Sequence, residues 1–369
     1  MRKIRLSAPW FSEAETEAVA RVLRTQVVNM GEEVKLFEEE LHKFFARADA
    51  KVTCVHSCTA ALQLSVQACG IGIGDEVLVP TYTFVASFQA VKANGAIPVP
   101  CDVDPNTGFL DIDDAKKRLT SKTKAIMPVL FAGCSSGIDD VYQFASENGL
   151  AVIEDAAHSF GDQDISKRNG ILCFSFDPIK NISCGDGGCV LTTQDTVTDK
   201  LKDLRLLGVE GDTDRRFLGQ RSWDTDVKTQ GWRLHMNNIA AAIGRAQLAR
   251  FSEIKARRLR NSETYVSAFS ALEEVKLLPI NTETAVPHIF PILVKNQKRN
   301  ALKAFLDTNG IETGVQYKPN HLLTYFNLGY DLPNSMKLYG QILSIPLHPL
   351  LSEDDVTYVT DKVLEFFSK

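Results

Sequence analysis

The sequence has no run of one charge and no long apolar run. Its 369 residues contain 41 lysines and arginines against 46 aspartates and glutamates, a formal net charge of -5 at pH 7, and no five consecutive basic residues. This balance gives no reason to expect a nucleic-acid partner. No window approaches 18 uninterrupted apolar residues, and residues 1–6 lack the apolar stretch of a signal peptide. We therefore expect a cytoplasmic protein without a membrane span.

The cysteines show no metal-binding pattern. Eight are scattered along the chain, none forms a C-x-x-C pair, and no histidines stand at a matching spacing. A structural zinc site is therefore not expected, and we predict no metal. Several cysteines lie in apolar runs, which is typical of reduced, buried thiols in a cytosolic protein. Internal repeats and low-complexity segments are also missing.

What the chain does contain, from residue 51 onward, is a regular alternation of apolar strands and helices. Short apolar strands that alternate with helices predict an α/β fold, in which a mainly parallel sheet is covered by helices on both faces in a three-layer αβα arrangement. Strands are predicted at 51–56, 76–80, 97–103, 125–130, 150–154 and 188–192, and helices at 57–70, 84–94, 111–119 and 137–148.

The segments on either side of this alternation complete the large domain and predict a second, smaller one. Two amphipathic helices, 12–25 and 31–46, precede the alternation, and a helix of small residues at 236–248 is expected to pack against its own core or another subunit. Residues 208–232 are polar and predict a long ordered loop. A charged helix from about 251 leads to strands near 287–294 and 313–317 and helices near 298–309 and 352–367. We predict a large domain over 1–250 and a small C-terminal α/β domain over 251–369.

Ligands of such sheets bind at the carboxyl ends of the strands. Four segments stand at these ends: 57–60, 81–84, 155–158 and 175–188. In the last of them, Lys180 lies between an apolar strand and a glycine-rich turn. In a pocket of low polarity its pKa falls and its free amine can condense with a carbonyl, although a lysine on a loop is more often simply exposed.

Asp155 follows the buried strand 150–154. By itself it could equally cap a turn or helix. Paired with Lys180 at a neighbouring strand end, it matches what pyridoxal 5′-phosphate requires, a lysine for the aldehyde and a carboxylate for the pyridine nitrogen. Ser57, Cys58, Thr59 and Ala60 open a helix whose amides and dipole form an anion site for the phosphate, although such residues also cap helices without any ligand. Ser175 points to the same region if strand alternation holds.

Taken together and in order, these motifs resemble the DegT/StrS family of nucleotide-sugar aminotransferases, which are fold-type I pyridoxal-phosphate enzymes. The resemblance runs over nearly the whole chain. It rests on residues 57–62 (Ser-Cys-Thr-Ala-Ala-Leu), 74–86, 102–105, 154–158 (Glu-Asp-Ala-Ala-His), 175–181, 185–188, 238–244 and 347–349.

The resemblance implies a role for each matching position. Lys180 is the Schiff-base lysine and proton shuttle, Asp155 holds the pyridinium, and His158 stands where the family often has a glutamine that touches the ring hydroxyl. Phe84 stands where an aromatic residue stacks on the cofactor ring, with plain core packing as the alternative. Thr59, the Ala60 amide and Ser175 hold the phosphate.

Three departures from the family pattern concern the rest of the site. Residues 230–236 differ from the loop that in relatives reaches the partner's cofactor phosphate, so that Arg233 or His235 would take this role in a homodimer. The segment between Asp155 and Lys180 is short near residues 161–170. Gln316 replaces a frequent histidine, which leaves Tyr317 and His321 as candidates to touch the sugar.

The resemblance implies a function as well as a fold. We expect an aminotransferase that uses pyridoxal 5′-phosphate, with pyridoxamine 5′-phosphate as its intermediate form. It would move an amino group from L-glutamate to a nucleotide-linked keto sugar, in the biosynthesis of polysaccharides such as lipopolysaccharide O-antigen or of natural-product sugars. Two alternatives stay open: a sugar dehydratase of the same fold, in which a histidine replaces the lysine, and a regulatory relative without catalysis.

Overall fold

The computed structural model describes residues 3–220 and 222–368, and its centre is a seven-stranded sheet. The strand order is β1-β7-β6-β5-β4-β2-β3. The strands are β1 (Lys51–Val55), β2 (Glu76–Pro80), β3 (Ile97–Cys101), β4 (Thr123–Ile126), β5 (Ala151–Asp155), β6 (Ile171–Ser175) and β7 (Gly188–Thr192). Only β7 in this sheet runs against its neighbours, β1 and β6, so the sheet is mainly parallel, as predicted.

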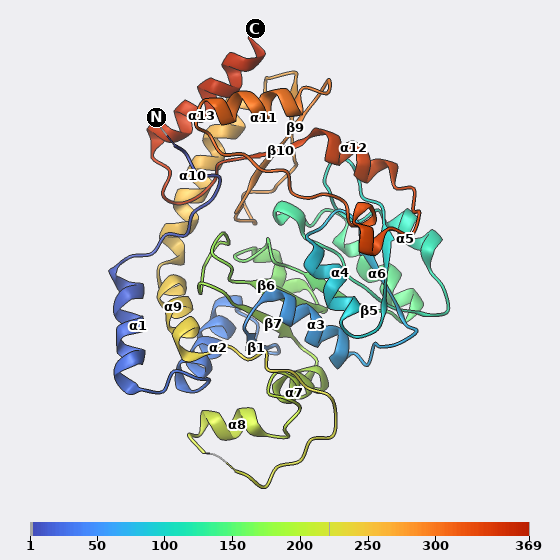
Figure 1. Cartoon of the computed structure of the whole chain (residues 1–369), viewed down its shortest axis with the longest axis vertical. Coiled ribbons are helices and arrows are strands. Elements are labelled where there is room, and N and C mark those ends of the chain that lie inside the picture. The colour runs from blue at the N-terminus through green and yellow to red at the C-terminus, as the bar shows by residue number, and fades with distance from the viewer. Residues whose placement is uncertain (1–2, 221, 369) are drawn as a thin grey trace.

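Helices cover both faces of this sheet, and each face has its own apolar core (Figure 1). One face packs against α2 (Glu32–Phe45), α5 (Ile112–Arg118) and α6 (Ile138–Asn148). The other packs against α3 (Cys58–Ala68), α4 (Val85–Lys92) and α7 (Asp195–Leu204). Because both faces are covered, the strands are apolar along their length: every residue of β6 and β7 is buried. The predicted three-layer αβα fold is confirmed.

Helix α9 (Asn238–Ala249) packs against α1 (Glu13–Thr25) and α2 of its own chain. Its small residues permit this close approach. A Cβ atom on Gly244 would lie 2.6 Å from Phe37 and 2.6 Å from the Cys184 Sγ, so only glycine fits there. The sequence left open whether this helix packs against its own core or another subunit. The structure shows that it does pack against its own core.

A second sheet of three antiparallel strands follows after α10 (Phe251–Phe269), with order β10-β9-β8. Its strands are β8 (Val275–Leu277), β9 (Phe290–Val294) and β10 (Ile342–Ile345), and its helices are α11 (Arg299–Thr308), α12 (Pro333–Gln341) and α13 (Glu353–Phe367). In Figure 1 this part lies above the large sheet, with both chain ends beside it. A separate apolar cluster that includes Tyr82, Phe131, Ile289 and Leu338 joins the two parts. In the described part of the chain no helix is long and apolar enough to cross a membrane.

The structure corrects several details of the sequence prediction. The strand predicted at 313–317 is wrong: this segment makes a single bridge, between Gly314 and Ser344, and then turns away. The polar stretch 208–232 is not only loop, because it contains α8 (Asp212–Phe217). Helices α7 and α12 and strands β8 and β10 were not predicted. The short strands carry too few residues for a clear period, and β10 has only four residues, all buried.

Candidate active site

All four strand-end segments of the predicted site line one cavity of about 240 Å³. The residues that line it include Ser57, Cys58 and Thr59 at the start of α3, Thr83 and Phe84 before α4, Asp155 and His158 after β5, Ser175 at the end of β6, and Lys180. Gln316 and Tyr317 close it from the segment before β10. The parallel arrangement brings these segments together because β1, β2, β5 and β6 all end at the same edge of the sheet.

Lys180 lies on the connection between β6 and β7, where it lines the cavity. Its Nζ lies 3.5 Å from Nε2 of His288. Burial lowers the pKa of the Lys180 amine below its ordinary value of 10.5, because an ammonium group loses its hydration there, although Cys58 and Asp155 oppose the shift. The amine is thus more readily available as the free base than a surface lysine, and the alternative of an exposed loop residue is wrong.

Asp155 ends β5 and is 5 % exposed. Its Oδ2 accepts a hydrogen bond of 2.7 Å from the Ser87 hydroxyl, and its Oδ1 accepts one of 3.2 Å from the Ala157 amide. Burial raises the pKa of this carboxyl, and the bond from Ser87 opposes the rise. A cation against the carboxylate would favour its ionised form, so the site is suited to a protonated ring nitrogen.

The opposite end of the cavity begins at α3. Ser57 caps this helix, and its hydroxyl accepts a hydrogen bond of 3.1 Å from the Ala60 amide. An α-helix leaves its first amides without partners inside the helix, and Cys58 and Thr59, at the positive end of the α3 dipole, line the cavity. The Ser175 side chain also lines this cavity, as strand alternation predicts.

Three ring systems form the remaining wall. The Phe84 ring, which is 55 % exposed at the N-terminus of α4, lies 5.6 Å from the Tyr317 ring. His158 Nδ1 accepts a hydrogen bond of 3.1 Å from the Ala132 amide, so its proton is on Nε2, which lies 3.2 Å from the Tyr317 hydroxyl. Burial keeps the pKa of His158 well below 6.5, so the ring is neutral near pH 7.

Other predicted residues do not line this cavity. The Ala60 amide is already bound by Ser57, so its predicted contact with a phosphate would require that bond to open. His321 is buried away from the cavity, with its Nδ1 2.9 Å from the Thr81 hydroxyl. Arg233 and His235 lie on the segment that runs beside the end of β1, where His235 forms a bridge with Val55.

Arg233 and His235 differ in exposure and charge. Arg233 is exposed, and its side chain makes no hydrogen bond or ion pair with the other residues that the structure describes. His235 is half-buried, and burial lowers its pKa to about 4, so it is neutral at pH 7. A charged donor on this segment is therefore Arg233.

The sequence did not reveal three residues behind the site. Ser87 binds Asp155, His288 approaches Lys180, and the guanidinium of Arg258 binds the Lys180 carbonyl. Ser87 carried a weak signal, as a polar residue near the start of the helix that follows one of the four segments. His288 and Arg258 carried none, because each is remote from the site along the chain.

A model of the DegT/DnrJ/EryC1/StrS aminotransferase family matches residues 10–364. The chain is 32% identical over 372 residues to the spore coat polysaccharide biosynthesis protein SpsC of Bacillus subtilis, which covers 97% of this chain and 95% of that protein. Both comparisons extend over the large sheet and the C-terminal part alike.

Solved structures give the same result. A putative sugar aminotransferase of Streptococcus pneumoniae, Spr1654 in its PMP form, superposes with a TM-score of 0.89 at 29% identity and full coverage of both chains. The aminotransferase TlmJ of Streptoalloteichus hindustanus superposes with a TM-score of 0.89 at 28% identity, covering 100% of this chain and 99% of its own.

Proposed function

Because the chain belongs to the DegT/DnrJ/EryC1/StrS aminotransferase family, we propose that it transfers an amino group from L-glutamate to a nucleotide-linked keto sugar. The family consists of enzymes that depend on pyridoxal 5′-phosphate, and solved relatives carry it as PLP or PMP. One observation carries the assignment of the site: a half-buried lysine with a lowered pKa and a buried aspartate line the same cavity, together with the first residues of α3.

The residues of the cavity fit this cofactor. Asp155 offers a carboxylate for the ring nitrogen, and Ser57, Thr59 and Ser175 offer hydroxyls near the start of α3 for the phosphate. Phe84 and Ala157 also line the cavity and would contact the ring. When bound, the cofactor supplies an electron sink that stabilises negative charge on the carbon next to the transferred amine.

The side chains of this chain would then divide the work. Lys180 would hold the cofactor through its amine and, once released by the incoming amine, move a proton between the substrate carbon and the cofactor. Asp155 would keep the ring nitrogen protonated, and Ser87 would orient its carboxylate. His158 would form a hydrogen bond with the hydroxyl of the cofactor ring as a neutral imidazole. Tyr317 would contact the sugar.

Two observations support a sugar as the amino acceptor. The curated relative SpsC is named for polysaccharide biosynthesis, and Spr1654 is described as a sugar aminotransferase. The presence of Lys180 disfavours the dehydratase alternative, in which histidine replaces this lysine. Retention of both Lys180 and Asp155 disfavours a regulatory relative that has lost catalysis.

The substrate proposal is tested by a direct assay of both half-reactions. We expect L-glutamate to convert the visible absorbance of the loaded enzyme to that of the amine form, with release of 2-oxoglutarate. A panel of keto sugars, each with and without its nucleotide, should then restore the first spectrum only for the nucleotide-linked forms. Equal rates with the free sugars would contradict the nucleotide linkage, and no response to glutamate would contradict the donor.

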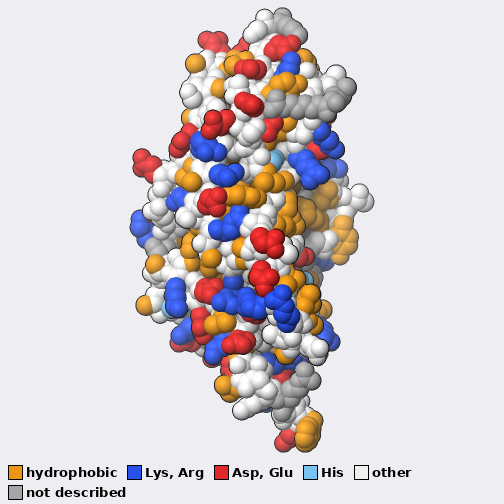
Figure 2. All heavy atoms as spheres, turned by 90° about the vertical axis from the view of Figure 1, so that its left-hand side faces the viewer, with side chains coloured by type: hydrophobic (Ala, Val, Ile, Leu, Met, Phe, Trp, Pro, Cys, Tyr) orange, Lys and Arg blue, Asp and Glu red, His pale blue; other side chains and the backbone are white. Residues whose placement is uncertain are grey.

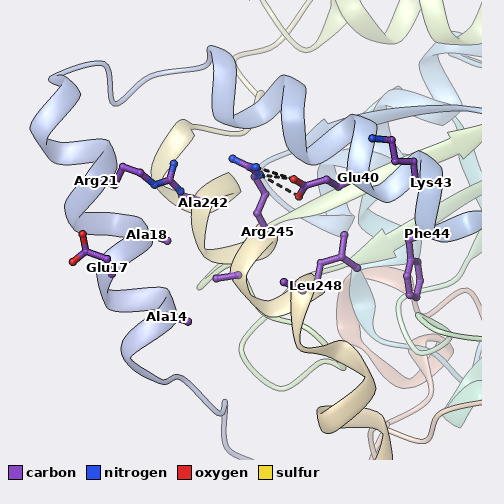
Figure 3. Close-up of a pocket in the computed structure, with 12 residues that line it drawn as sticks. Ala14, Glu17, Ala18, Arg21, Glu40, Lys43, Phe44, Ala242, Arg245 and Leu248 are labelled. Atoms are coloured by element: carbon purple, nitrogen blue, oxygen red, sulfur yellow. Dashed lines mark hydrogen bonds and ion pairs between the residues drawn. The ribbon is translucent and has the colours of Figure 1, made fainter.

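We further propose that the enzyme is a homodimer in which Arg233 of each subunit reaches the cofactor phosphate of the other. The support is that Arg233 is exposed beside the end of β1, yet outside the cavity of its own chain. A second feature is an open hollow of about 740 Å³ on the outer face of α1, α2 and α9, lined by several alanines and spanned by the Arg245–Glu40 ion pair (Figure 3). Figure 2 shows apolar and charged side chains intermixed on this side of the molecule.

Mixing two inactive variants tests the shared site. Arg233→Ala and Lys180→Ala are each expected to lose most activity, whereas mixed dimers contain one site with both changes and one intact site. Recovery of up to about a quarter of wild-type activity is expected after subunit exchange, from random pairing of two-fold symmetric dimers. His235→Ala is the matched variant: if it complements Lys180→Ala and Arg233→Ala does not, His235 holds the partner's phosphate instead. Sedimentation of the active enzyme as a monomer would contradict both.

A further inference from the structure

A buried histidine of the C-terminal part of the chain lies behind Lys180. His288, two residues before β9, is 1 % exposed and is not among the residues that line the cavity. Its Nε2 lies 3.5 Å from the Lys180 Nζ, and its ring packs edge-on against the His158 ring at 4.2 Å between centroids. His288 thus contacts two residues that line the cavity without belonging to its surface.

The backbone around this contact is held by a buried cation. The Arg258 guanidinium, which is 2 % exposed, donates to the carbonyl of Lys180 at 3.1 Å and to the carbonyl of His288 at 3.1 Å. The side-chain amide of Asn181 donates a further hydrogen bond of 2.8 Å from its Nδ2 to the Val286 carbonyl. One rigid group therefore fixes the two backbones whose side chains meet, so the distance between Lys180 and His288 is built into the fold.

The protonation state of His288 follows from its surroundings. Burial and the neighbouring His158, Lys180 and Arg258 lower its pKa well below 6.5, so the imidazole is neutral. Its Nδ1 is buried without a hydrogen-bond partner in the described residues. An orphaned N–H group costs more than an orphaned lone pair, so the proton belongs on Nε2, where it can be donated to the free amine of Lys180.

We propose that His288 is a positioning residue for Lys180, whose Nε2–H binds the lone pair of the lysine amine and holds the amine at the cavity wall. This inference rests on the proposed role of Lys180. The other titratable groups around Lys180 are Cys58 from α3, Asp155 from β5, His158 after β5, Asp177 from its own connection and Arg258 from α10. The two neutral donors among them are already engaged, since the Cys58 thiol bonds to the Cys173 carbonyl and His158 Nε2 lies 3.2 Å from the Tyr317 hydroxyl.

A structural role and a positioning role predict different binding data. Condensation of pyridoxal 5′-phosphate joins Nζ to its aldehyde carbon and releases the aldehyde oxygen with the two amine hydrogens as water. Pyridoxamine 5′-phosphate has no aldehyde and binds without using this amine. A residue that merely supports the fold would affect both compounds, whereas a residue that directs the amine affects only the first.

The test compares His288→Leu with His288→Gln in protein freed of cofactor. We expect His288→Leu to slow condensation about tenfold, through a poorly placed amine, while the affinity for pyridoxamine 5′-phosphate stays within about twofold of wild type. His288→Gln, whose amide nitrogen reaches about as far as Nε2, should recover most of the rate. His348→Gln is the matched control, because His348 is also buried with an unpartnered Nδ1 but binds the Arg5 carbonyl.

Three outcomes would overturn the proposal. They are an unchanged condensation rate in His288→Leu, an equal loss of affinity for both compounds, or a His288→Gln variant no better than His288→Leu. Borohydride reduction and peptide mapping of the wild type separate this proposal from the proposed function. If the reduced cofactor is found on a lysine other than Lys180, the assignment of the site itself is wrong.

Discussion

Replacing Lys180 with methionine is expected to lower the rate of amino transfer by at least about 1000-fold, since it would remove both the covalent hold on the cofactor and the proton transfer that we propose for this lysine. Steady-state assay of glutamate-dependent transfer measures this. Lys318→Met is the matched control, because Lys318 neighbours Tyr317 but is exposed and does not line the cavity. A Lys180→Met enzyme with undiminished activity would falsify the assignment.

The same substitution is expected to raise the free energy of unfolding at pH 7. The folded-state pKa of Lys180 lies below 10.5, because the folded site favours the charged amine less than water does, so the lysine lowers the free energy of unfolding at neutral pH. This cost amounts to about 1.4 kcal/mol for each pKa unit by which the folded state lies below the unfolded state, and it disappears as the pH rises to the pKa of the unfolded lysine. Denaturant titrations at pH 7 and above pH 10 should therefore show a stabilised variant whose advantage shrinks at high pH. Lys180→Arg, which keeps its charge throughout, should be destabilised at both.

Replacing Asp155 with asparagine is the second large expected effect, a loss of at least about 100-fold in the rate of amino transfer. Asparagine keeps the shape and can still accept the Ser87 bond, but it removes the negative charge that we propose keeps the ring nitrogen protonated. The measurement is the single-turnover rate with glutamate, which isolates the proton transfer from the binding of the sugar.

Ser87→Ala provides the graded comparison for Asp155. It removes one hydrogen bond of 2.7 Å to the carboxylate and leaves the charge in place. We expect a loss of about tenfold, in line with the value of one hydrogen bond to a charged group. If Ser87→Ala were as damaging as Asp155→Asn, the charge of Asp155 would not be the feature that matters.

The large sheet could be predicted because its short strands are largely apolar and alternate with helices. The predicted strand 76–80 and the strand 188–192 agree with β2 and β7 residue for residue. Lys180 and Asp155 could be paired because both follow neighbouring strands, so topology alone brings them to one edge. The family resemblance then supplied the chemistry of the cofactor.

The supporting residues could not be predicted, because their contacts join distant parts of the chain. Ser87 reaches Asp155 from a helix that follows another strand, and His288 reaches Lys180 from the second sheet. The segment 313–317 was misjudged for a related reason. Its apolar and aromatic residues suggest a strand, but Tyr317 is needed at the wall formed by Phe84 and His158, and the backbone leaves the sheet to place it there.

The antiparallel strand β7 has a consequence for how the chain folds as it leaves the ribosome. In the described residues, β1 is hydrogen-bonded in the sheet to β7 alone, with Val55 opposite Gly188. Until β7 has been synthesised, β1 has no partner strand in the sheet, and α3, which begins three residues after β1, lacks this support on its N-terminal side. The edge of the site at the start of α3, where we propose that the phosphate binds, is therefore completed only when the last strand of the large sheet has been made, so its formation depends on a long-range strand pairing.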